Sequence, residues 1–371
     1  MMLTDNLKKA FIDAVENSSE IEPLVRILQK ELHPGVLNCY GSEVAKLPLG
    51  FNRVEGRALA EQWELTARTA SEFFNLEAVA WLPVLLSQIA FALPETTLGM
   101  MDAITQGWRQ GRMTKEDTTR AALAQPEVWE TVLAKAELSD PAMLPASRLV
   151  PADLQKLFWR QVESIPGSNN IIETVTNYGA AYDQPLREAY ATAMLQHTGL
   201  PEAYQENYLR PPLNIQDLKD YPKGTLAYAY YHQIVDNGLD VEILKVTQKV
   251  SIGGVVDYAG QRIFQTHDLW HVLTEYTTDG LDEIALQAFQ LAQLGSPFSS
   301  NLLASLMTRA LLFDPQSIPY FMQAICVGWT HGRKTPPLLP VKWEQAWGQP
   351  VVELRRQHQI EPFTANLMAM V

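Results

Sequence analysis

The chain has 371 residues, of which 47% are apolar and 19% are charged, and its formal net charge is −13. This length and composition predict a packed globular protein with room for two domains, and they exclude a disordered chain. The negative charge argues against a nucleic-acid partner, because binding to phosphates needs a basic surface. The only two cysteines, Cys39 and Cys326, lie far apart, so we expect no disulfide framework and a reducing compartment.

No segment is predicted to cross a membrane. Residues 1–16 are polar and amphipathic and lack the apolar centre of a secretory signal. The longest apolar stretch, residues 78–97, contains Pro83 and Pro94 and is predicted to be a buried helix. We therefore expect a cytoplasmic protein, with peripheral contact to the inner membrane surface as the alternative.

Helical periodicity recurs along almost the whole chain and predicts an all-α, bundle-like fold. A short strand at residues 241–250 is the one exception that the pattern allows, although a buried helix rich in Val and Ile would look the same. Helices are predicted at residues 5–15, 23–32, 54–74, 78–97, 99–112, 154–163, 185–197, 227–235, 256–276, 281–294, 301–312, 319–329 and 351–359.

The periodicity divides into two parts. Residues 138–152 carry three prolines without strong periodicity and are the predicted linker. They separate an N-terminal helical domain, residues 1–137, from a second domain, residues 153–371.

One stretch recurs in both parts. Residues 101–112 and 322–333 agree at seven of twelve positions and both end in Gly-Trp-x-x-Gly-Arg. One interpretation is that the N-terminal half is a shortened, degenerate copy of the C-terminal half that packs against it as a pseudo-dimer. The other is a chance match between two helix ends, where Gly and Arg are favoured in any case.

The second domain holds the strongest chemical motif, His267-Asp268-x-x-His271. On a helix the two histidines are one turn apart, with Cβ atoms about 5–6 Å from each other, and Asp268 projects from the same side. Two imidazoles and a carboxylate in this arrangement can bind a divalent metal. A lone histidine on a helix is more often structural, so the prediction depends on the whole set.

Two carboxylates are candidates for the fourth ligand. Glu283 follows the turn at residues 277–280 and opens the next helix, so it can face back towards the histidines. Glu275 lies two turns after His267 on the same helix and could share its face. Two nitrogen and two oxygen donors suit zinc, iron or manganese better than magnesium.

At this point the sequence resembles the family of the fourth coenzyme-Q biosynthesis protein, the CoQ-four family. Its signature, His-Asp-x-x-His followed by eleven residues and Glu, fits His267, Asp268, His271 and Glu283 without adjustment. Weaker similarities, at 223–226, Arg262, 329–332 and 341–344, extend the resemblance over residues 186–360. Residues 1–185 lie outside it, and Glu275 with Thr277-Thr278 stands where the family has smaller residues.

The resemblance implies a helical protein that holds zinc or a similar ion at these four residues, beside a site for a polyprenylated hydroxybenzoate or another isoprenoid lipid. Iron, manganese and magnesium are the alternative ions. It implies loss of the ring carboxylate and hydroxylation at that carbon. Apolar helices at 302–313 and 319–327 would then surround the lipid tail, although apolar stripes of this kind are more often plain core. It also implies contact with other quinone-biosynthesis proteins, and a homodimer is a further expectation.

A second class of function stays open. The metal could stiffen a helix pair in a non-catalytic lipid-binding scaffold that organises other enzymes. A closed site with four protein ligands would favour the scaffold, and an open coordination position would favour an enzyme. Two other metal-dependent hydrolases fit less well: an HD-type phosphohydrolase needs further ligands, and an HExxH peptidase needs Glu at Asp268.

Overall fold

The computed structural model describes residues 3–17, 21–41, 59–116, 148–164, 177–239 and 254–370. Throughout these residues the secondary structure is helical, with one isolated β-bridge between Thr225 and Pro350. The all-α prediction is therefore confirmed. The alternative strand at 241–250 lies outside the described residues.

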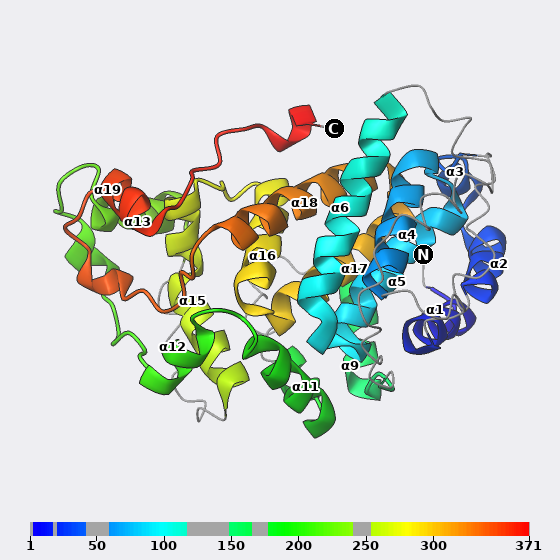
Figure 1. Cartoon of the computed structure of the whole chain (residues 1–371), viewed down its shortest axis with the longest axis horizontal. Coiled ribbons are helices and arrows are strands. Elements are labelled where there is room, and N and C mark those ends of the chain that lie inside the picture. Colours follow the sequence, from blue (N-terminus) through cyan, green and yellow to red (C-terminus); the bar gives the residue numbers. More distant parts are fainter. Residues whose placement is uncertain are drawn as a thin grey trace. The chain divides into compact units, whose positions relative to one another are not determined.

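The described residues form two compact units, residues 1–186 with 300–322, and residues 187–299 with 323–371 (Figure 1). Helices whose bounds lie in the first unit are α1 (Asp5–Asn17), α2 (Glu22–Glu31), α3 (Pro34–Leu37), α4 (Leu59–Phe73), α5 (Leu76–Ser87) with a π-helical turn (Gln88–Ala92), α6 (Thr97–Glu116) and α9 (Ala152–Glu163). Those in the second are α11 (Gln184–Met194, from its fourth residue), α12 (Leu200–Glu206), α13 (Leu226–Asp236), α15 (Val255–Thr274), α16 (Gly280–Leu294) and α19 (Val351–His358). Two helices, α17 (Pro297–Phe313) and α18 (Ile318–Lys334), contain the points where the chain passes between units.

The first unit has an aromatic core that explains where α9 belongs. Phe158 stacks on Phe11 with ring centroids 5.8 Å apart and meets Phe91 edge-on at 5.2 Å. These contacts place α9 in the first unit, whereas the sequence analysis assigned residues 153–186 to the second domain. Most of the predicted linker, 138–152, lies outside the described residues.

The second unit is arranged around α15, which contacts α12, α13, α16 and α19. Its buried residues include Leu269, Trp270 and Leu273, each of which is at most 1% exposed. Burial of this apolar stripe fixes the rotation of α15 about its axis, and thereby decides which of its residues are left to face other elements.

Two helix pairs repeat each other at a constant offset of 221 residues. The bounds of α4 and α16 correspond position for position, and Gly107 and Gly111 of α6 correspond to Gly328 and Gly332 of α18. A Cβ atom on Gly107 would lie 2.0 Å from the carbonyl oxygen of Glu64 in α4. One on Gly328 would lie 1.9 Å from the carbonyl oxygen of Ala285, which is the counterpart of Glu64.

The caps that follow each first helix also correspond. The Asn75 side chain accepts a hydrogen bond from the backbone N–H of Ala78, and Ser296 accepts one from Ser299, again 221 positions later. Agreement in bounds, close glycine contacts and caps favours a duplicated unit over a chance match between helix ends. In the first copy, Gln62 stands at the position of Glu283.

No single helix in the described parts of the chain is long and apolar enough to cross a membrane. The helices at Leu76–Ala92 and Pro94–Arg112 reach that length only as a pair, and they are bent by 112° at the break between them.

Candidate metal centre

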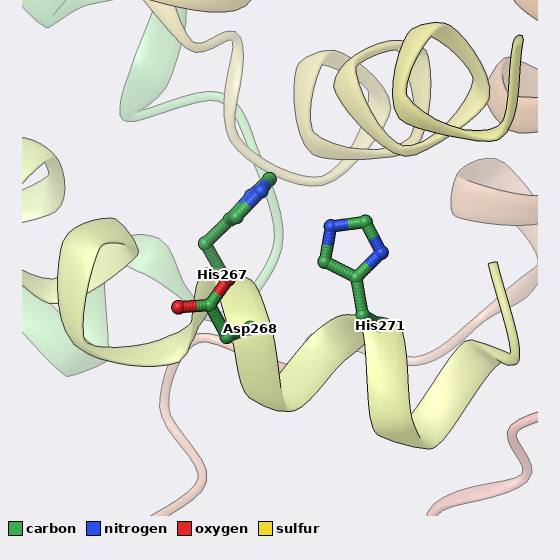
Figure 2. A group of neighbouring side chains, drawn as sticks. All are labelled: His267, Asp268 and His271. Atoms are coloured by element: carbon green, nitrogen blue, oxygen red, sulfur yellow. The ribbon is translucent and has the colours of Figure 1, made fainter. Parts of the chain in front are cut away.

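The two histidines and Asp268 come from the C-terminal half of α15. Its apolar residues face the core, so His267, Asp268 and His271 leave the helix on another side, and Figure 2 shows both imidazole rings extending in the same direction. One ligand atom from each of the three residues lies within 4.8 Å of the others. His271 is buried, and His267 and Asp268 are partly exposed.

Glu283 completes the group from the first turn of α16. One carboxylate oxygen lies 3.2 Å from Nε2 of His271, and the other lies 3.5 Å from Nε2 of His267. The short turn after α15 brings the two helices into contact, as the sequence analysis expected. Glu283 therefore lies beside both imidazoles, and Asp268 groups with the same imidazoles from α15.

The Nδ1 atom of each imidazole is already engaged on the opposite side of its ring. Nδ1 of His271 lies 2.9 Å from the backbone carbonyl oxygen of Tyr276, and the Gln290 side-chain amide contacts Nδ1 of His267. These contacts fix the ring orientations and leave both Nε2 atoms directed at Glu283. Metal-binding histidines in proteins are commonly held in this way. The Gln290 amide can present its oxygen to a protonated Nδ1 by a half-turn of the group.

A second relay orients the Glu283 carboxylate. The Gln287 amide donates a 2.8 Å hydrogen bond to it, and the Ser299 hydroxyl donates a 2.8 Å hydrogen bond to the amide oxygen of Gln287. Gln287 and Gln290 are buried residues four and seven positions after Glu283, so they lie on the same side of α16.

The electrostatics of the cluster favour a positive charge among these groups. Burial lowers the pKa of His267, but the Glu283 carboxylate and then Asp268 raise it more, to about 9. Burial likewise raises the pKa of Glu283, but the two imidazoles hold it well below its ordinary value. A divalent ion would supply that positive charge and would coordinate the Nε2 and carboxylate atoms that face one another.

Glu275, the competing candidate, does not join the cluster. It ends α15 in the left-handed conformation, with φ of 63°, and its backbone N–H bonds to the carbonyl of His271. Its carboxylate pairs with Arg355 at 2.5 Å. Because the helix stops at Thr274, the regular geometry that would have brought Glu275 onto the ligand face does not apply.

The candidate metal centre lies in the part of the chain that is similar to known proteins. Residues 205–364 match the family model described as coenzyme Q (ubiquinone) biosynthesis protein Coq4. The chain is 27% identical over 150 residues to the mitochondrial ubiquinone biosynthesis protein COQ4 homolog of Rattus norvegicus, covering 40% of this chain and 56% of the rat protein. The Bos taurus homolog is 27% identical over 164 residues, covering 42% and 60%.

A solved structure is also similar. It is the crystal structure of a protein from Nostoc punctiforme, provisionally named a ubiquinone biosynthesis protein, with 25% identity and a TM-score of 0.47. The match covers 56% of this chain and 97% of that one. The curated relatives, by contrast, are spanned over little more than half of their length.

Proposed function

We propose that this chain acts in ubiquinone biosynthesis as a metal-dependent protein on a prenylated aromatic acid, because residues 205–364 match the Coq4 family model. The ion is held by His267, Asp268, His271 and Glu283. The ligand is a polyprenylated hydroxybenzoate or a related isoprenoid compound.

The observation that carries the proposal is the pair of Nε2 atoms directed at one carboxylate. Both Nδ1 atoms are engaged elsewhere, so each ring offers the centre a single donor in a fixed orientation. An ion pair alone would need only one of the two imidazoles. Zinc suits two nitrogen and two oxygen donors best, with iron, manganese and magnesium as alternatives.

The proposed reaction replaces the ring carboxylate by a hydroxyl group. One mole each of acid, dioxygen and water would give the phenol, CO₂ and hydrogen peroxide, so that dioxygen takes up the two electrons lost when hydroxyl replaces the carboxylate. An ion held by the cluster would supply Lewis acidity for the substrate carboxylate. His271 is the buried member of the set, whereas His267, Asp268 and Glu283 are partly exposed, so a ligand would reach the centre from the side of these three residues.

The alternative is a non-catalytic scaffold that binds a prenyl lipid and other quinone-biosynthesis proteins, at a membrane surface or as a homodimer. There the ion only joins α15 to α16. The curated relatives are named as mitochondrial; the cytoplasmic location expected for this chain stays a prediction.

The decisive experiment combines metal content with turnover. Elemental analysis of the purified protein should find about one divalent ion per chain, and His271→Ala should lose both the ion and the conversion of a prenylated hydroxybenzoate. His232→Ala is the matched control, because His232 is partly exposed and its only hydrogen bond among the described residues is to Asp236. Product formation by the metal-free protein would refute a metal-dependent enzyme. A wild-type protein that holds the ion but shows no turnover would favour the scaffold.

A further inference from the structure

Arg210 lies beside α15, one turn before the metal ligands. The Gln265 side chain holds its backbone from both directions, accepting from the N–H at 2.8 Å and donating to the carbonyl at 3.0 Å. Gln265 precedes Asp268 by three residues, so the two side chains leave neighbouring positions on the helix surface. The Arg210 side chain is 5% exposed.

Two buried guanidinium groups share one buried carboxylate in this region. Arg262 takes both oxygens of Glu344, at 2.5 and 3.2 Å, and also donates to the carbonyl oxygen of Val341. Arg210 comes no closer than 3.8 Å to the same carboxylate. Within the described parts of the chain its guanidinium makes no hydrogen bond, so two buried positive charges share one buried negative charge and Arg210 has only the longer contact with it.

That imbalance is costly unless a ligand offsets it. A buried cation whose donors are unused loses hydration without a compensating partner. The nearby cation Lys342 does not share the imbalance, because it pairs with Glu206. A planar guanidinium with free donors matches the two oxygens of a carboxylate or a phosphate.

Tyr230 of α13 links Arg210 to the metal cluster. Its ring is 2% exposed, and its hydroxyl makes no hydrogen bond with any described residue. Burial raises the pKa of this hydroxyl, the Asp268 carboxylate raises it further, and Arg210 opposes both effects. The hydroxyl thus interacts electrostatically with a proposed metal ligand, Asp268, and with the Arg210 guanidinium.

We propose that Arg210, with the Tyr230 hydroxyl, binds an anionic group of the ligand, a carboxylate or a phosphate, next to the metal cluster. This inference rests on the proposed function for the identity of the larger ligand, but the anion site is built without any metal ligand. Arg262 is a positioning residue here, because it takes the hydrogen bonds of Glu344 and leaves Arg210 only a 3.8 Å contact with that carboxylate.

The test measures anion binding to the metal-free protein at low ionic strength. Benzoate and inorganic phosphate are titrated separately by calorimetry, so the preferred anion class is read from the same experiment. Arg210→Gln should raise the dissociation constant of the preferred probe at least about tenfold, because a charge-assisted hydrogen bond is lost. Arg210→Lys should be intermediate, and Tyr230→Phe should weaken binding by a smaller factor.

Arg356→Gln is the matched control and should bind the probe like the wild type, because Arg356 is exposed and pairs with Glu353. Glu283→Gln should also retain anion binding while losing the metal, which separates this inference from the proposed function. The inference is overturned if the wild type binds neither probe, or if Arg210→Gln and Tyr230→Phe both bind as tightly as the wild type.

Discussion

At the scale of single residues, the second unit depends on how its buried charges are paired. Arg262 is 1% exposed and joins α15 to the segment after α18 through Val341 and Glu344. Arg210, a few ångströms away, makes no comparable bond. The two arginines should therefore respond to substitution in opposite ways.

Arg262→Gln should lower the free energy of unfolding by about 3–5 kcal/mol, because it leaves the Glu344 carboxylate buried without its bidentate partner. Arg210→Gln should not lower it, since that substitution removes a buried charge whose contact with Glu344 is long, at 3.8 Å, while Arg262 keeps its bonds to the carboxylate. Denaturant titration at neutral pH measures both. Equal losses in the two variants would contradict the assignment of Glu344 to Arg262.

A buried histidine should make stability depend on pH. Burial lowers the pKa of His197 to about 4 from its ordinary value of 6.5, although its Nδ1 contacts the carbonyl of Ala292. Between these values the unfolded chain binds a proton that the folded chain does not, so stability falls as the pH is lowered from about 6.5 towards 4. The denaturant concentration at the unfolding midpoint should be lower at pH 5 than at pH 7. This decrease should be smaller in His197→Asn than in the wild type. His232→Asn, at a partly exposed position, should keep the full drop.

The residues around the candidate site show where sequence reasoning ends. His267, Asp268, His271 and Glu283 stand at a spacing that a helix and a turn translate directly into proximity. Tyr276 acts through its backbone carbonyl, which no side-chain motif reveals. Gln287 and Gln290 have only their i+4 and i+7 spacing from Glu283 as a signal, and amides at such positions are usually solvated.

At the scale of elements, the close helix contacts depend on glycine. Gly328→Ala should destabilise the protein by about 1–3 kcal/mol or more, because the new methyl group would overlap the backbone of Ala285. Gly107→Ala should act similarly through Glu64. Gly99→Ala, in the same helix as Gly107 but with nothing within 4 Å, should be neutral or stabilise by about 0.4–1 kcal/mol. Thermal unfolding of the three variants tests the contact, and equal effects would contradict it.

Helix positions followed from periodicity, but helix ends did not. The predicted helix 256–276 stops at Thr274, because Glu275 adopts the left-handed conformation and Arg355 bonds the carbonyls of Val272 and Leu273. That arginine lies about eighty residues away in the sequence, so no local pattern announces it. The aromatic contacts that place α9 in the first unit are equally non-local.

At the scale of the whole molecule, the duplicated helix pair provides an internal control for metal binding. Zinc should slow hydrogen exchange in α15 and α16 and raise the unfolding temperature. The free energy of unfolding should rise by up to about 4 kcal/mol when zinc is in thousandfold excess over its dissociation constant. It should leave exchange in α4 unchanged, where Gln62 replaces the carboxylate of Glu283. Glu283→Gln should abolish both effects, and Glu275→Gln should preserve them. Protection spread evenly over α4 and α16 would refute a single centre.

The close backbone contact between Gly328 and Ala285 fixes the position of α16, the helix that carries Glu283. Ala285 and Phe289 lie on the side of α16 away from Glu283, and there the helix rests backbone to backbone on α18. Because no side chain separates the two backbones at this contact, α16 cannot shift towards α18 to make room for a larger ion. The distance from Glu283 to the two imidazoles is therefore set by the scaffold, so an oversized ion such as calcium would have to strain the bundle to enter. Size discrimination among cations would then originate in two glycines that touch no ligand.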